Sequence, residues 1–173
     1  PTGKLGFISN CILNVMGINI KLNGIRHKNL ETLKNSVDPD ISSFLQEWYD
    51  SHDHVIGHTS GSTGIPKEIR LLKKDMIASA RLTNEFFNIR PSSNLLLCLS
   101  PKYIAGKMMI VRTILSGANL ITVKPSSSPL QNITEDIDFA ALVPMQVATS
   151  LSSPDTATKL ARVKQIIIGG AAV

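Results

Sequence analysis

Short apolar runs alternate with amphipathic stretches along most of this chain. Four continuous apolar runs predict buried strands, at residues 95–99, 119–123, 139–143 and 165–168. Apolar residues at helical spacing predict helices over 73–89, 105–115 and 144–151. Because buried strands alternate with helices, the pattern predicts an α/β fold, with mixed or parallel sheets covered by helices on both faces.

The N-terminal third carries two further patterns. Residues 18–25 alternate apolar and polar side chains around Asn23-Gly24, which predicts a half-exposed hairpin. In residues 40–49, apolar side chains recur at helical spacing after Asp38-Pro39, so a helix is expected to begin there. Trp48 lies on its apolar face, where packing in the core is the ordinary outcome; lining a purine pocket is the alternative.

A segment rich in hydroxyl groups, residues 58–67, lies between two predicted strands at 54–58 and 68–72. Glycines in it can adopt positive φ and let backbone N–H groups converge on an anion, hydroxyl groups add donors, and Lys67 adds a charge. The spacing differs from G-x-x-x-x-G-K-[ST], and strand flanks favour a backbone nest over a helix N-terminus. The predicted phosphate ligands are Thr59, Ser60, Gly61, Ser62, Thr63, Gly64 and Lys67. A flexible turn is the alternative interpretation.

Composition narrows the class of protein. With 173 residues and 43% hydrophobic content, the chain suits one domain or a lobe of a larger one. Its net charge of +5 comes from scattered residues, and aromatic side chains are not interleaved with basic clusters, which disfavours nucleic-acid binding. No apolar run is long enough to span a bilayer. Two distant cysteines, Cys11 and Cys98, imply no disulfide framework and favour a cytoplasmic location.

Residues 1–15 are expected to be a non-native or disordered leader, with Met16 as the natural start. The apolar beginning only vaguely resembles a signal peptide, because Asn10 and Asn14 interrupt it and no small-x-small cleavage site follows.

The string T-S-G-S-T-G-x-P-K at residues 59–67 resembles the phosphate loop of the adenylate-forming ligases. About a hundred residues later, Gly169-Gly170-Ala171 resembles the segment that borders the adenylate and acyl pocket in that family. The resemblance implies that residues 16–173 are part of the large N-terminal AMP-binding domain, that the C-terminal domain is absent, and that Lys67 is catalytic. It also implies ATP, Mg²⁺ and coenzyme A as substrates or cofactors.

Two other segments bear on the acid substrate. The family commonly has P-x-x-H-x-x-G where this chain has Ser100 to Gly106, so Tyr103 replaces the histidine and Gly106 is kept. Lys102 or Lys107 could attract a second carboxylate, or both could be solvated helix ends. Gln146 lies in a V-P-x-Q segment that resembles the o-succinylbenzoate-CoA ligases of menaquinone biosynthesis; it is expected to contact substrate or to face water.

The resemblance therefore implies ATP-dependent activation of a carboxylic acid, o-succinylbenzoate by preference, followed by transfer to CoA. The partners expected are the acid, ATP and CoA, with a homo-oligomer possible and no nucleic acid or membrane insertion. This chain alone is expected to be inactive. The alternatives are a generic acyl- or aryl-CoA ligase and a truncated, non-catalytic nucleotide-binding module.

A metal site is the remaining alternative, since His52, His54 and His58 lie near Asp53. If residues 54–58 form a strand, however, His54 and His58 are about 13 Å apart, too far for one ion. No metal ligand is therefore predicted.

Overall fold

The computed structural model describes residues 18–34, 37–58 and 68–170. In chain order the strands are β1 (Ile20–Leu22), β2 (Ile25–His27), β3 (His54–His58), β4 (Glu68–Leu72), β5 (Asn94–Leu97), β6 (Asn119–Thr122), β7 (Phe139–Leu142) and β8 (Gln165–Ile168). The helices are α2 (Leu30–Lys34), α3 (Pro39–Tyr49), α4 (Lys73–Phe86), α5 (Ile104–Ser116), α6 (Pro144–Leu151) and α7 (Pro154–Arg162).

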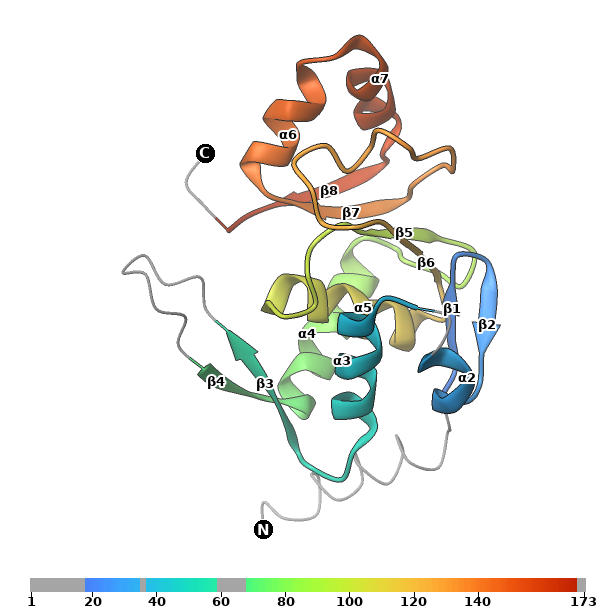
Figure 1. Ribbon diagram of the computed structural model, residues 1–173, viewed down its shortest axis with the longest axis vertical. Coiled ribbons are helices and arrows are strands. Elements are labelled where there is room, and N and C mark those ends of the chain that lie inside the picture. Colours follow the sequence, from blue (N-terminus) through green and yellow to red (C-terminus); the bar gives the residue numbers. More distant parts are fainter. Residues whose placement is uncertain (1–17, 35–36, 59–67, 171–173) are drawn as a thin grey trace.

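Six strands form one twisted sheet in the order β2-β1-β6-β5-β7-β8. All neighbouring pairs are parallel except the antiparallel pair of β1 and β2. Helices α3, α4 and α5 cover one face of this sheet, and α6 and α7 lie on the other (Figure 1). The predicted α/β fold, with a mostly parallel sheet covered on both faces, is therefore confirmed.

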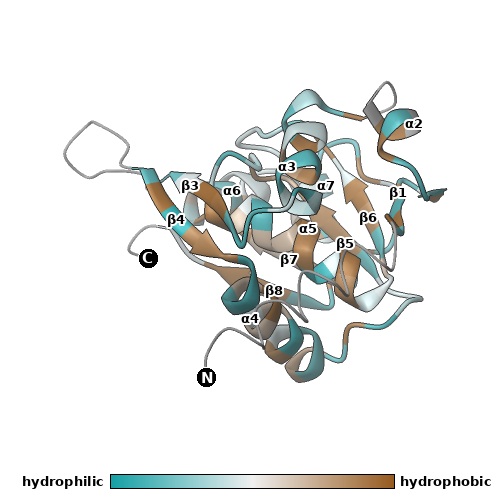
Figure 2. Ribbon diagram, turned by 90° about the horizontal axis from the view of Figure 1, so that it is seen from below, coloured by the Kyte–Doolittle hydropathy of each residue, from teal (hydrophilic) through white to brown (hydrophobic). Residues whose placement is uncertain are grey.

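Two hydrophobic cores explain why the strand sequences are continuously apolar. Strand β5 and the residue after it send Leu95 and Leu97 into the core beneath α3–α5, and Leu96 and Cys98 into the core beneath α6 and α7. A strand buried on both faces has no reason to alternate. Figure 2 shows these central strands in hydrophobic colours, with hydrophilic residues on the surrounding helices. Trp48 lies fully buried in the first core, so the packing interpretation is correct.

The predicted hairpin is present as β1 and β2. Asn23 and Gly24 join the strands with positive φ angles of 46° and 83°, the conformation that a type I′ turn requires. The turn also binds the neighbouring strand β6, because Asn23 N donates to Leu120 O at 2.9 Å. The hairpin is thus held at the edge of the sheet.

One predicted helix ends earlier than expected, and two further helices were not predicted. The helix expected over 73–89 ends at Phe86, because Asn88 adopts a left-handed φ of 51° that stops the helix before Arg90-Pro91. Helix α7 was not predicted, although Ser153-Pro154-Asp155 is a typical helix start. This helix has few apolar residues, among them the buried Leu160, so the sequence shows no clear helical spacing of apolar side chains. The short helix α2 was also not predicted.

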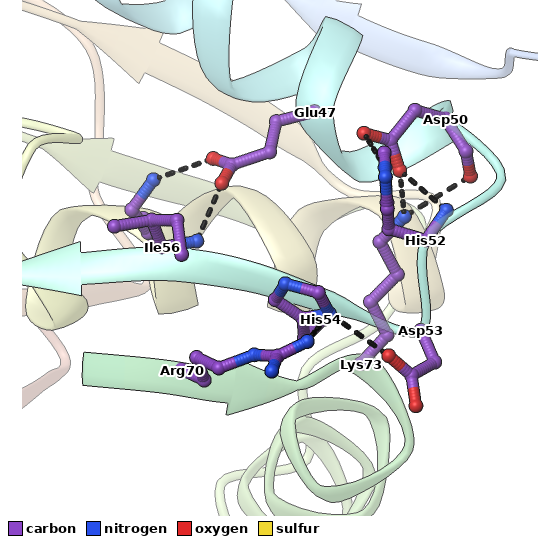
Figure 3. A network of polar contacts seen from close by, with 9 residues as sticks. Glu47, Asp50, His52, Asp53, His54, Ile56, Arg70 and Lys73 are labelled. Atoms are coloured by element: carbon purple, nitrogen blue, oxygen red, sulfur yellow. Dashed lines mark hydrogen bonds and ion pairs between the residues drawn. The ribbon is translucent and has the colours of Figure 1, made fainter. Parts of the chain in front are cut away.

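Strands β3 and β4 form a separate antiparallel pair, which confirms that the predicted phosphate loop joins two strands. Polar contacts attach this pair to α3 (Figure 3). Glu47 accepts a hydrogen bond from Ile56 N of β3 and forms an ion pair with Lys107 of α5 at 3.1 Å. The buried Lys73, directly after β4, donates to the Asp50 carboxylate at 2.8 Å. Both strands are therefore fixed relative to the helical layer.

The carboxyl group of Asp50 responds to this environment. Partial burial by itself would raise the pKa of Asp50, but hydrogen bonds from Lys73 and His52 outweigh it and lower the pKa below its ordinary value. Asp50 therefore stays ionised and keeps the Lys73 ammonium paired.

Candidate active site

A cavity of about 620 Å³ opens at the carboxyl end of the sheet. Its walls come from the ends of β3, β4, β5, β7 and β8, from the start of α5 and α6, and from the loop after β6. The lining residues are His58, Ile69, Cys98, Leu99, Ser100, Tyr103, Ile104, Ala105, Pro125, Ser126, Ser127, Val143, Met145, Gln146 and Gly170.

Parallel topology explains why these segments meet. Strands β5, β7 and β8 are neighbours that run in the same direction, so the residues after them gather at one edge. Ligands of open α/β sheets usually bind outside this edge. The cavity is therefore where the fold itself favours a ligand site.

The β3–β4 pair borders the same cavity. His58, the last residue of β3, and Ile69 of β4 both line it, and His58 forms a parallel bridge with Tyr103 at the start of α5. The predicted phosphate ligands Thr59, Ser60, Gly61, Ser62, Thr63, Gly64 and Lys67 lie outside the described residues. The segment that carries them nevertheless begins directly after His58, at the wall of the cavity.

The two lysines proposed to attract a second carboxylate do not line the cavity. Lys107 is buried, forms its ion pair with Glu47 and places its ammonium 4.6 Å from the centre of the Phe44 ring. It is thus neither a solvated helix end nor a free cation. Lys102 is exposed, and its Nζ lies 3.5 Å from an Asp40 carboxylate oxygen. Tyr103, by contrast, does line the cavity.

Gly106 shapes the cavity wall without facing the cavity. A Cβ at this position would lie 2.4 Å from the Ser100 carbonyl oxygen and 2.8 Å from that of Leu99. Leu99 and Ser100 line the cavity, so the missing side chain lets the first turn of α5 pack directly on this wall.

Replacing Gly106 with alanine is expected to lower the free energy of unfolding by about 2 kcal/mol, because the clash is with backbone that cannot rotate away. Urea unfolding of the variant and the native protein measures this difference in the free energy of unfolding. The neighbouring exposed Ala105→Gly is the control and should cost about 1 kcal/mol through helix propensity alone. A Gly106→Ala variant as stable as the native protein would show that the wall moves freely.

The remaining predicted residues lie at the ends of β7 and β8. Gly170, with a φ of 90°, lines the cavity, whereas Gly169 is exposed and its N–H donates to Leu142 O. Ala171 lies outside the described residues. Gln146 lines the cavity but is buried and hydrogen-bonded to the protein, so it does not face water.

Cys98 behaves as the small buried hydrophobe that its sequence context predicts. Burial raises the pKa of its thiol to about 12, so the thiol is not an activated nucleophile at neutral pH. In the part of the chain that the structure describes, it is a free cysteine.

Several lining residues were not identified from sequence. The segment Pro125-Ser126-Ser127 was not identified as part of the site, although it follows the carboxyl end of β6 and so had to emerge at the same edge as the other walls. Val143 and Met145 belong to the V-P-x-Q segment noted for Gln146, but their apolar side chains gave no chemical reason to expect them in the cavity wall.

The three candidate metal ligands point to different carboxylates. His52 contacts Asp50, His54 contacts Asp53, and His58 Nε2 lies 3.8 Å from Glu68. Among the described side chains, no three His, Cys, Asp or Glu groups converge as a metal site. None of the described helices is both long and apolar enough to cross a membrane.

The family assignment follows from this fold and from a direct match. Residues 17–173 match the family described as AMP-binding enzyme, and the chain belongs to that family.

The chain is also similar in sequence to ligases of known name. The chain is 26% identical over 132 residues to a protein named probable 2-succinylbenzoate–CoA ligase from Mycobacterium tuberculosis, covering 72% of this chain and 34% of that protein. It is 30% identical over 115 residues to the 2-succinylbenzoate–CoA ligase of Salmonella typhimurium, covering 66% and 24%. The chain thus spans about a third or less of these relatives.

Solved structures show the same fold. An acyl-CoA synthetase (AMP-forming)/AMP-acid ligase II-like protein from Dyadobacter fermentans superposes with a TM-score of 0.72 and 33% identity, covering 83% of this chain and 42% of that one. The o-succinylbenzoate CoA synthetase of Bacillus subtilis, in complex with its acyl-adenylate intermediate, gives a TM-score of 0.55 at 21% identity, covering 68% and 31%. The second likeness concerns the fold alone.

Proposed function

We propose that this protein activates a carboxylic acid with ATP and transfers the acyl group to coenzyme A. The observation that carries the proposal is the position of the β3–β4 pair. Both of its strands border the cavity, and the segment between them has the hydroxyl groups, glycines and lysine suited to a polyphosphate. Residues 16–173 would then belong to the N-terminal AMP-binding domain, in keeping with the family match over 17–173.

The chemistry has two balanced steps. A carboxylate oxygen attacks the α-phosphorus of ATP, an acyl–O–P bond forms, and the bond to the departing pyrophosphate breaks. The CoA sulfur then attacks the acyl carbon, the thiol proton passes to solvent, and AMP leaves. In this scheme Thr59 to Lys67 would hold the pyrophosphate portion, and the cavity would hold the acyl group close to it.

Mg²⁺ is the ion expected to accompany ATP, where it would neutralise phosphate charge. The described part of the site offers no cluster of acidic or imidazole ligands for it. No step is therefore assigned to a protein-bound ion.

The preferred acid is o-succinylbenzoate, a proposal supported by two relatives that bear this name. A generic acyl- or aryl-CoA ligase is the second candidate, and a specific observation favours it. The described cavity lining contains no lysine or arginine to meet a second carboxylate, and the nearby Lys107 is paired with Glu47. The two candidates differ only in the acid.

Exchange of labelled pyrophosphate into ATP, measured on the native gene product with a panel of acids, tests the proposal. Exchange that depends on o-succinylbenzoate supports the preferred acid; exchange with aryl or medium-chain monocarboxylates supports the generic ligase. No exchange with any acid, together with ATP binding, would indicate a non-catalytic nucleotide-binding module instead.

A further inference from the structure

The side chain of Gln146 joins three separate walls of the cavity. Its Nε2 donates to the carbonyl oxygens of Cys98, at 3.3 Å, and of Ser126, at 2.9 Å. Its Oε1 accepts from the backbone N–H of Val143 at 3.2 Å. All three partners line the cavity, after β5, after β6 and after β7 respectively.

The chemistry of the amide suits this connection. Glutamine has two N–H donors and one carbonyl acceptor, and here both donors and the acceptor are engaged by the protein. The side chain is only 3% exposed, so a bound ligand would find no free hydrogen-bonding group on it. Substrate contact, one of the two outcomes expected from the sequence, is therefore not what this geometry favours.

The backbone of Gln146 is itself fixed. It lies in the first turn of α6, its N–H donates to Val143 O at 3.0 Å, and its carbonyl accepts from the buried Ser150 hydroxyl at 2.7 Å. The amide thus extends from a hydrogen-bonded helix start to two chain segments that follow the ends of β5 and β6. Because the Gln146 side chain is fixed at its helix and hydrogen-bonded to both segments, it holds them at a defined distance from α6.

We propose that Gln146 is a positioning residue, which fixes the width of the acyl cavity by holding three of its walls together and does not touch the substrate. The inference rests on the proposed function, because the cavity must hold the acid for its width to matter. It predicts that removing the brace weakens binding of the acid and leaves binding of ATP unchanged.

Gln146→Glu is the sharpest variant, because glutamate has the same shape and keeps the acceptor for Val143 N. Its ionised carboxylate cannot donate to Cys98 O or Ser126 O, whereas the protonated form regains one donor. Burial against two carbonyl oxygens raises the pKa of such a carboxyl. At pH 8.5 the KM for the acid in pyrophosphate exchange should rise about tenfold, and at pH 6 it should return to within about threefold of the native value. Gln131→Glu, at an exposed position, is the control.

The thiol of Cys98 gives a second readout that needs no catalysis. In a Cys11→Ser background it is the one cysteine left, and its side chain is buried beside Gln146. Gln146→Leu should increase its rate of reaction with 5,5′-dithiobis(2-nitrobenzoate) about tenfold, because the wall that covers it loses its brace. Ile77→Ala, in the other core, controls for general destabilisation and should change the rate much less.

The acid KM and the rate of thiol reaction together decide whether Gln146 positions the cavity walls. Faster thiol reaction together with a pH-dependent rise in acid KM supports the brace. A rise in acid KM without a change in thiol rate indicates direct substrate contact, and a faster thiol reaction with unchanged KM shows that cavity width is irrelevant. Either result overturns the inference, and so does a change in neither. If the native protein exchanges with no acid, the proposed function fails and with it the role in acid binding, while the thiol rates still decide whether Gln146 braces the walls.

Discussion

Replacing Lys67 with alanine is expected to reduce acid-dependent pyrophosphate exchange about a hundredfold. In the proposed reaction, negative charge grows on the departing pyrophosphate, and Lys67 is the one lysine or arginine in the segment 59–67, which begins directly after His58 of the cavity wall. A cation that acts on the leaving group stabilises the transition state more than bound ATP. The loss should therefore appear in kcat, with the KM for ATP changing less.

Lys74→Ala is the matched control, because Lys74 is an exposed lysine on α4, beyond the end of β4. It should retain native exchange. If Lys67→Ala exchanges as fast as the native protein with every acid that supports exchange, the phosphate role of this segment is wrong.

Replacing Glu47 with glutamine is expected to lower the free energy of unfolding by about 3 kcal/mol. The substitution keeps an acceptor for Ile56 N–H but removes the negative charge that pairs with Lys107. Lys107 is 5% exposed, so its ammonium would remain buried without a counter-charge. This loss is at the lower end of the range for buried ion pairs because the Glu47 side chain is itself 28% exposed.

A double variant separates the charge from the shape. Glu47→Gln combined with Lys107→Met removes both charges and should recover stability to within about 1 kcal/mol of the native protein. Lys102→Met breaks the exposed pair with Asp40 and should cost less than about 1 kcal/mol. Guanidinium unfolding of the four proteins gives the comparison. If Glu47→Gln and the double variant lose the same free energy of unfolding, the unpaired Lys107 charge is not the cause of the loss.

Sequence patterns predicted the sheet because its strands are short, apolar and regularly separated. The hairpin at Asn23-Gly24 and the helix after Asp38-Pro39 were predicted for local reasons, namely turn and capping chemistry. The end of α4 was misplaced, since the apolar spacing continues to Phe87 while the backbone turns at Asn88. Such a stop depends on one residue that adopts positive φ, which periodicity does not report.

The candidate site was predictable only where a motif carried chemistry. Tyr103 and Gly170 were identified from motif resemblance and line the cavity. Lys107 looked like a free cation because sequence does not reveal that Glu47, sixty residues away, lies beside it. Gln146 was expected to contact substrate or to face water for the same reason, since its partners Cys98 and Ser126 are distant in sequence.

The central claim is that the cavity at the carboxyl end of the sheet holds the acid. Ala105 lines it from the exposed first turn of α5, so the indole ring of Ala105→Trp would occupy part of the cavity. Pyrophosphate exchange by the native gene product should then show a KM for the acid raised at least about tenfold, with the KM for ATP unchanged. Ala78→Trp, exposed on α4, should behave as the native protein. An unchanged KM for the acid in Ala105→Trp, or a rise confined to ATP, would contradict the account.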